Sequence, residues 1–269
     1  MNRLVIIGNG FDMAHGLKTS YMDFINWYWD QRVNTFVGNT TKVSEDILCK
    51  LQIKGNEDIS CWNVFAFQNS FFFKDIYHKE RYSGFEIIQE IRQHPKVFSV
   101  ECCPFFETIL QSIETKGWVD IENDYYQTLK NNIDSPRCDY NVIELNKQLS
   151  FLQNKLVEYL KTIETSELKN DLKGEIVENF NPADFSTEGK KRALRSIGLE
   201  NYELAELSNK PYKQQKLRPK RTMLLSFNYT GTAKMYDGNN IELNFIHGDL
   251  EHPENIIFGY GDELDKNYQ

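Results

Sequence analysis

Two residues suited to proton transfer and hydrogen bonding follow apolar runs late in the sequence. Asn228 ends the run in "LLSFNYT", and His247 ends the run in "NFIHGDL", with Gly248 directly after it. An imidazole has an unperturbed pKa near ~6.5 and can act as a base close to neutral pH, while an asparagine amide can orient a ribose or a water molecule. Alone, such a histidine is more often a turn residue and such an asparagine a cap. Their joint occurrence at strand ends favours a site.

A glycine turn near the N-terminus supplies a different chemistry. The apolar run Leu4–Ile7 meets the turn Gly8–Gly10, where a helix is expected to begin. This order of strand, glycines and helix points backbone N–H groups and the positive end of a helix dipole at a phosphate. The dinucleotide fingerprint GxGxxG is incomplete, because its third glycine falls on Met13. The turn therefore predicts an anion site rather than a standard dehydrogenase; a glycine turn that binds nothing is the alternative.

These residues need strands whose carboxyl ends lie together, because ligands of parallel sheets bind at that edge. The apolar runs predict four strands: Leu4–Ile7, Thr222–Phe227, Leu243–Ile246 and Asn255–Phe258. The first is a continuous apolar run, which is typical of a strand covered on both faces. The last strand leads into Gly259.

The middle of the chain, roughly residues 20 to 210, is expected to be mostly helical. Helical periodicity and capping residues predict these helices: Tyr21–Gln31, Phe85–Gln93, Phe105–Ile113, Trp118–Ile133 and Tyr140–Thr165. The last carries a heptad-like apolar stripe from Val142 to Ile163, which favours packing in a bundle within the chain over a dimer seam. The predicted fold is α/β. Residues 1–20 and 221–269 form a Rossmann-like parallel sheet, and residues 21–220 form a large helical insertion.

Composition excludes several classes of protein. Of the 269 residues 26% are charged and 40% hydrophobic, an ordinary globular balance, and the net charge of −8 argues against broad nucleic-acid binding. The basic stretch Lys210–Arg221 is either a solvated connection or an anion-steering patch. Five cysteines without a CxxC pair indicate free thiols and no metal site. No signal peptide and no apolar stretch of ~20 residues occur, which predicts a cytoplasmic protein without a membrane partner.

Five stretches resemble the AbiH family of bacteriophage abortive-infection proteins. They are "IIGNGFDMAHGLKTSYMDF", "WVDIE", "LLSFNYT", "FIHGDL" and "IIFGYGDE", in that order. The resemblance implies defence against bacteriophage and says little about a reaction.

A more distant resemblance addresses the reaction. Sirtuin-like NAD-binding domains carry a glycine loop, an Asn at a strand end, a His-Gly pair and a Phe-Gly strand end, and this sequence is similar in order and spacing. Gly16 then corresponds to the glycine of the Gly-Ile-Pro segment that follows the glycine loop in those domains. The residues that this reading places around the ligand are Gly8, Asn9, Gly10, Phe11, Gly248 and Gly259. The sequence departs at Asp12, which replaces a serine, and at Lys18, which replaces a proline.

The sirtuin-like resemblance implies cleavage of the nicotinamide–ribose bond of NAD without a metal. His247 is the expected base, and Asn228 would orient the ribose or the attacking water. Asp12 would bind a ribose hydroxyl or stabilise the developing cation; its alternative is a helix N-cap. Continuous destruction of NAD would kill the host, so gating is expected from the helical insertion or from a homo-oligomer, with an unknown phage trigger.

Two other functions remain open on the sequence alone. One is a nucleotide-binding sensor without turnover, which would use the same pocket for a small-molecule nucleotide. The other is a nucleic-acid-directed effector that uses the basic stretch Lys210–Arg221. The acidic residues at the strand ends lack the spacing of a metal site that a nuclease would need.

Overall fold

The computed structural model describes the chain in ten stretches: residues 2–38, 43–54, 83–96, 98–116, 121–134, 141–163, 176, 178–181, 185–199 and 217–257. The chain forms two compact units. The first comprises Met1–Lys18 with Ile163–Ile257, and the second comprises Thr19–Thr162 with Phe258–Gln269. Ile163 to Lys220, which the sequence analysis assigned to the insertion, therefore falls in the first unit.

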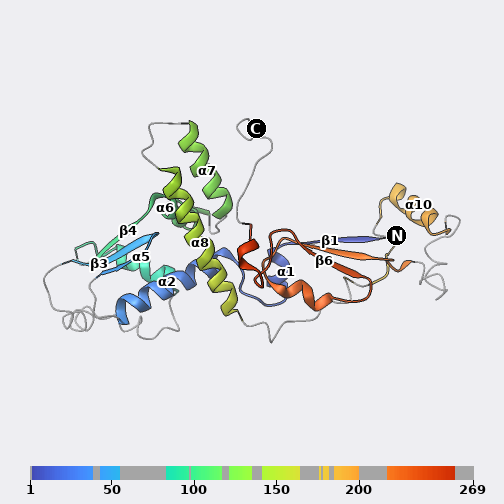
Figure 1. Cartoon of the computed structure of the whole chain (residues 1–269), viewed down its shortest axis with the longest axis horizontal. Coiled ribbons are helices and arrows are strands. Elements are labelled where there is room, and N and C mark those ends of the chain that lie inside the picture. The colour runs from blue at the N-terminus through green and yellow to red at the C-terminus, as the bar shows by residue number, and fades with distance from the viewer. Residues whose placement is uncertain are drawn as a thin grey trace. The chain divides into compact units, whose positions relative to one another are not determined.

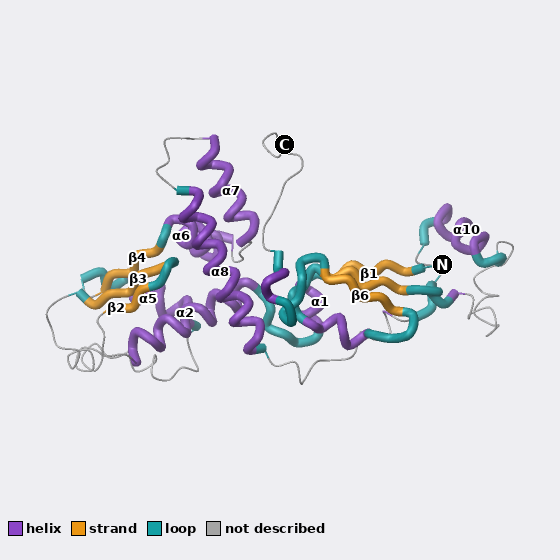
Figure 2. Tube along the Cα trace, in the orientation of Figure 1, coloured by secondary structure: helices purple, strands orange, loops and turns teal. Residues whose placement is uncertain are grey.

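The first unit contains a parallel sheet drawn from both ends of the chain. Its strands are β1 (Arg3–Ile7), β5 (Thr222–Ser226) and β6 (Ile241–Phe245), in the order β1-β5-β6. Figure 1 shows β1 in blue beside the orange strands of the C-terminal half, and Figure 2 shows the three strands side by side. Ile7 lies opposite Ser226, which lies opposite Phe245. The predicted α/β class and three of the predicted strands are confirmed, and their carboxyl ends share one edge.

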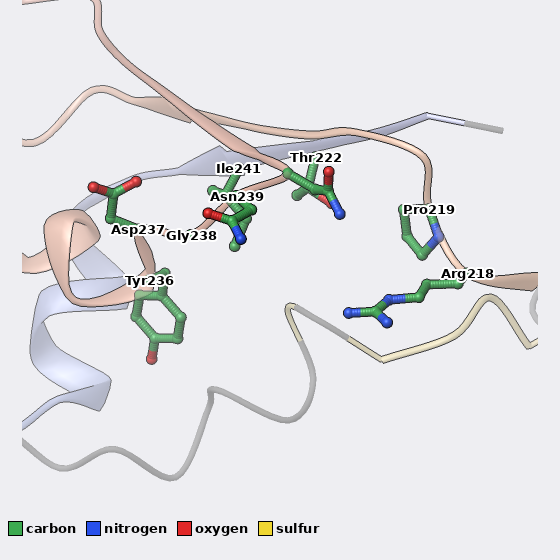
Figure 3. A pocket seen from close by; sticks show the side chains of 9 residues that line it. Arg218, Pro219, Thr222, Tyr236, Asp237, Gly238, Asn239 and Ile241 are labelled. Atoms are coloured by element: carbon green, nitrogen blue, oxygen red, sulfur yellow. The ribbon is translucent and has the colours of Figure 1, made fainter. Parts of the chain in front are cut away.

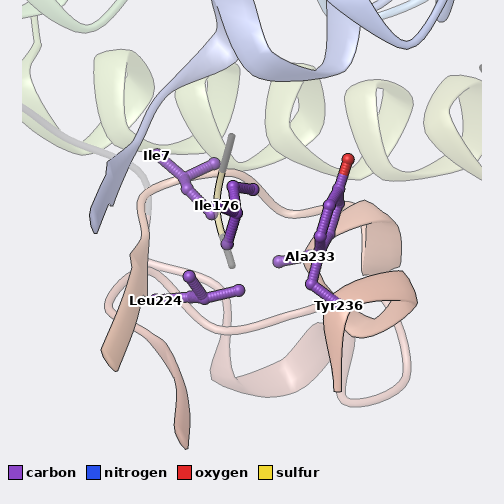
Figure 4. Close-up of a cluster of buried hydrophobic side chains, with 5 residues drawn as sticks. All are labelled: Ile7, Ile176, Leu224, Ala233 and Tyr236. Atoms are coloured by element: carbon purple, nitrogen blue, oxygen red, sulfur yellow. The ribbon is translucent and has the colours of Figure 1, made fainter. Parts of the chain in front are cut away.

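One face of this sheet is packed, and the other is open in the described part of the chain. Ile7 and Leu224 form a core with Ala233 and Tyr236 of the 3₁₀ helix η3 (Gly231–Tyr236), as Figure 4 shows. On the opposite face Leu4 is 58% and Ile6 69% exposed. The expectation that the first strand is covered on both faces is therefore wrong for the described residues. Phe11 of helix α1 (Asn9–Ala14), Ile176 and η3 cover the packed face.

The fourth predicted strand, Asn255–Phe258, is wrong where the structure describes it. Pro253–Asn255 form the 3₁₀ helix η4, and Ile256 and Ile257 lie in no regular element. The ring of Pro253 fixes its φ at a value that suits the start of a helical turn, and its carbonyl accepts the N–H of Ile256 at 3.2 Å. Phe258 lies outside the described residues.

The local backbone conformation explains why a glycine occupies position 16, an explanation that the sequence alone did not provide. It follows α1 with φ +88°, a left-handed conformation that favours glycine at the C-terminus of a helix. Its N–H donates to Met13 O at 2.9 Å, and the N–H of Leu17 donates to Asp12 O at 3.1 Å. These bonds satisfy the last carbonyls of α1 and turn the chain sharply. Farther along the first unit, helix α10 (Thr187–Ser196) begins after Ser186, whose Oγ accepts the N–H of Gly189.

The second unit contains all five predicted helices together with a sheet that the sequence analysis did not predict. The helices are α2 (Tyr21–Gly38), α5 (Gly84–Arg92), α6 (Pro104–Lys116), α7 (Ile121–Asp134) and α8 (Val142–Thr162). The strands are β2 (Val43–Glu45), β3 (Cys49–Ile53) and β4 (Phe98–Cys102), paired antiparallel in that order. The expectation of a mostly helical middle therefore omitted a three-stranded sheet.

The apolar stripe of α8 packs within the chain, as predicted. Leu145, Leu152 and Leu156 are buried, and α8 contacts α2 and α7. Only the start of the stripe departs from the prediction, because Val142 is 40% exposed. The buried part of the stripe therefore packs beside α2 and α7 of the same chain.

Candidate functional site

The candidate site lies at the carboxyl edge of the parallel sheet. Gly8 directly follows β1, while Asn228 and His247 each come two residues after the ends of β5 and β6. Neighbouring strands are ~4.8 Å apart, so the ends of β1 and β6 are separated by ~10 Å with β5 between them. The structure thus places three of the four predicted strand ends at one edge. The fourth, at Gly259, lies outside the described residues.

Asn228 joins the end of β5 to the glycine turn. Its Nδ2 donates to the carbonyl oxygen of Gly8 at 3.0 Å, and its backbone N–H donates to Ser226 Oγ at 3.2 Å. The side chain is nearly buried, and its Oδ1 accepts no hydrogen bond from the described residues. Asn228 therefore fixes the position of the turn and retains one acceptor.

The glycines at positions 8 and 10 have room around them. A Cβ placed on either residue meets no heavy atom within 4 Å, and neither residue has a positive φ. Gly8 is the N-cap of α1, and Gly8, Asn9 and Gly10 are all exposed. The described part of the chain therefore does not demand glycine at these two positions.

Asp12 is a buried carboxylate with one hydrogen-bond partner. It is 1% exposed, and its Oδ2 accepts from Thr230 Oγ1 at 2.5 Å. Thr230 Oγ1 lies 3.1 Å from Thr232 Oγ1, while Asp12 Oδ1 is buried without a partner among the described residues. The alternative that Asp12 is an N-cap is wrong, because Gly8 holds that position and Asp12 lies four residues beyond it. An unpartnered buried oxygen is costly, which makes Asp12 a candidate for function.

His247 lies beside two aromatic rings. Its ring stands edge-on to Phe227 at a centroid distance of 5.4 Å and is 6.2 Å from the ring of Tyr229. It is half-buried, and its carbonyl oxygen accepts the N–H of Ile257 at 3.0 Å. The structure therefore leaves the imidazole partly accessible at the edge that also carries Asn228.

The loop after His247 is held by a glycine and a carboxylate. Gly248 has φ +79°, and a Cβ there would come within 2.6 Å of the carbonyl oxygen of Asn255. Asp249 Oδ2 accepts from Lys234 Nζ at 3.2 Å, and its Oδ1 accepts the N–H groups of Glu251 and His252. Burial raises the pKa of the Asp249 carboxyl, but Lys234 and these N–H groups outweigh burial and hold that pKa below its usual value.

A buried histidine–tyrosine pair was missed by the sequence analysis. His15 is 1% exposed, and its Nδ1 lies 2.7 Å from the carbonyl oxygen of Phe11. Since a carbonyl only accepts, Nδ1 donates to it, and Nε2 forms a hydrogen bond with the Tyr236 hydroxyl at 2.5 Å. The sequence gives one signal, the i, i+4 spacing of Phe11 and His15 on a helix. Nothing in it connects position 15 to position 236.

The other predicted features lie partly outside the described residues. Of the basic stretch Lys210–Arg221, residues 217–221 are described, and Arg221 pairs with Glu242 at 3.5 Å. In the described ranges, no three His, Cys, Asp or Glu side chains gather as they would to hold a metal ion. The helices within those ranges also include none with the length and apolar character needed to span a membrane.

Comparison with known proteins identifies one relationship. The family model described as "Bacteriophage abortive infection AbiH" matches residues 4–269, nearly the whole chain. No curated protein and no solved structure matches the chain.

Proposed function

The chain belongs to the AbiH family, and from that premise we propose that it acts through a nucleotide pocket at the carboxyl edge of its parallel sheet. Membership implies a role in bacteriophage abortive infection. The proposed reaction is cleavage of the nicotinamide–ribose bond of NAD, with NAD as substrate and water as the acceptor.

The space around the glycine turn is the observation that carries this proposal. Nothing among the described residues lies within 4 Å of a Cβ placed on Gly8 or Gly10, and neither residue has a positive φ, so the exposed turn leaves room for an incoming ligand. The turn precedes α1, and Asn228 fixes it through the Gly8 carbonyl. Such a turn suits the diphosphate of a dinucleotide, and Gly8, Asn9, Gly10 and Phe11 are the proposed diphosphate contacts.

The proposed chemistry assigns a role to each polar residue of the edge. The bond between ribose C1′ and the ring nitrogen breaks, and nicotinamide leaves with the electron pair while the oxygen of water bonds to C1′. His247 takes the proton of that water. The unused Oδ1 of Asn228 orients a ribose hydroxyl or the water. Asp12 was expected to bind a ribose hydroxyl or to stabilise the developing cation; because its side chain is buried and accepts from Thr230, the proposal instead gives it the role of positioning the β5–η3 connection.

An NAD hydrolase in a living host needs control. Unregulated cleavage would remove NAD before infection, so the proposal includes gating by the helical unit or by homo-oligomerisation after a phage-derived signal.

The direct test incubates the purified full chain with NAD, with and without an extract of phage-infected cells, and measures nicotinamide by chromatography. We expect release by the wild type and a loss of roughly a hundredfold or more in His247→Ala, because a general base contributes that much. His252→Ala is the matched control, since His252 is exposed five residues later. Absence of nicotinamide under both conditions would contradict the proposal.

A nucleotide sensor without turnover is the second candidate. It is favoured by the internal bonds of Asn228 to Gly8 and of Asp12 to Thr230, which suit a rigid binding pocket. In that case His247→Ala retains both nucleotide affinity and protection against phage.

A further inference from the structure

A hollow lies at the opposite edge of the parallel sheet, away from the candidate NAD site. Its volume is about 380 Å³, and its lining includes Thr222 and Ile241, the first residues of β5 and β6. Pockets that bind small molecules usually have volumes of about 300–1,000 Å³. The volume of this hollow is near the lower limit, which suits a ligand smaller than a dinucleotide. A ligand proposed for this hollow therefore does not depend on the proposed NAD chemistry.

Four exposed polar side chains of this hollow have no partners among the described residues. Arg218, Asp237, Asn239 and Asn240 line it, and in the described ranges none of their side chains makes a hydrogen bond or an ion pair. Arg221, three residues after Arg218, is by contrast paired with Glu242. Within the described part of the chain, these exposed charged and amide groups are therefore available to a ligand.

These groups are distributed in an ordered way along the hollow. Figure 3 shows Arg218 and Pro219 at one end, Tyr236 and Asp237 at the other, and Asn239 between them. A guanidinium matches the geometry of a phosphate with paired N–H donors. A carboxylate and amide oxygens accept from hydroxyl groups, as acidic residues do from ribose in dinucleotide sites. The lining thus offers an oxyanion end and a hydroxyl end.

We propose that this hollow, lined by Arg218, Asp237 and Asn239, binds a phosphorylated monosaccharide, with the phosphate at Arg218 and the sugar hydroxyls at Asp237 and the asparagine amides. The ring of Tyr236 and the ring of Pro219 supply apolar walls. The like charge of Asp237 requires that the phosphate lie at the far end, which the arrangement in Figure 3 allows.

The test titrates the full chain with ribose 5-phosphate in a calorimeter. Wild type binds, and Arg218→Gln weakens binding by at least about tenfold, the effect of one charge-assisted hydrogen bond. Arg221→Gln removes the same charge outside the lining and leaves the affinity unchanged. Unfolding midpoints of both variants stay close to the wild-type value, because Arg218 is exposed without a partner in the described chain and the exposed Arg221–Glu242 ion pair contributes little to stability.

Two further experiments locate the bound ligand and compare the contributions of its sugar and its phosphate to binding. Ribose and inorganic phosphate, titrated singly, each bind more weakly than ribose 5-phosphate. Hydrogen exchange shows protection of residues 237–241 by ribose 5-phosphate and none of residues 8–12. The proposal is overturned if ribose 5-phosphate does not bind, if Arg218→Gln binds as wild type does, or if protection appears at residues 8–12 instead.

Discussion

Individual glycines of this chain divide into two kinds. Gly16 and Gly248 have positive φ values, and a side chain at Gly248 would collide with the backbone at Asn255. Gly8 and Gly10 have ordinary φ values and open space. The first kind serves the fold, and the second kind is explained by the proposed ligand.

Substitution of Gly248 tests the first kind. Gly248→Ala should lower the free energy of unfolding by about 1–3 kcal/mol, because the residue must leave the left-handed region or displace Asn255. Gly10→Ala is the matched change and should leave stability equal or slightly higher, since alanine favours the helix. Chemical denaturation measures both. Equal stability of Gly248→Ala and wild type would show that the loop adapts freely.

Loss of the Asn228 amide should loosen the glycine turn. Asn228→Ala removes the hydrogen bond to Gly8 O, and we expect a loss of about 1 kcal/mol in the free energy of unfolding. Asn244→Ala is the control, because Asn244 lies on the exposed face of β6. Faster hydrogen exchange of residues 8–12 should accompany the Asn228 change alone. A uniform effect of both variants on exchange would contradict this role.

A buried thiol should make the second unit sensitive to alkali. Burial, together with Asp46, raises the pKa of Cys49 from 9.0 to about 11. The folded state therefore favours the neutral thiol, so this contribution is complete below pH 9 and is lost as pH rises toward 11. Wild-type stability should fall more steeply than that of Cys49→Ala by about 1.4 kcal/mol per pH unit above pH 9. Parallel slopes in denaturation series at pH 7 to 10.5 would refute the assignment.

Secondary-structure elements show which sequence signals predicted the fold. Continuous apolar runs predicted β1, β5 and β6, and periodicity predicted α8. The sheet β2-β3-β4 was missed because its strands, VSE, CKLQI and FSVEC, mix polar with apolar residues and contain no continuous apolar run, so that only their antiparallel pairing identifies them. Such pairing is decided by tertiary contacts, which local propensity does not contain.

The α8 stripe allows a prediction at this scale. Leu152 is 0% exposed, and Leu152→Ala should destabilise the second unit by about 2–5 kcal/mol through lost burial and a cavity. Val142→Ala, at the exposed start of the same stripe, should change stability by less than about 0.5 kcal/mol. Thermal unfolding followed by circular dichroism compares them. Similar losses from both variants would mean that the stripe is buried along its whole length.

At the scale of the whole molecule, the candidate site joins residues that are far apart in sequence. Asp12 meets Thr230 across 218 positions, and His15 meets Tyr236 across 221. The sequence predicted that the strand ends converge, because parallel strands share an edge. It did not predict these pairs, since no local pattern links a helix residue to a particular hydroxyl on a distant turn.

Binding of ADP-ribose to the wild type and to Gly10→Val tests the central claim most directly. ADP-ribose carries the diphosphate and riboses of NAD without the scissile bond. We expect binding by the wild type and at least about tenfold weaker binding by Gly10→Val with an unchanged unfolding midpoint, because the added side chain meets no described residue and obstructs the proposed diphosphate contact. Equal affinities for the two proteins, or no binding by the wild type, would contradict a nucleotide pocket at this edge.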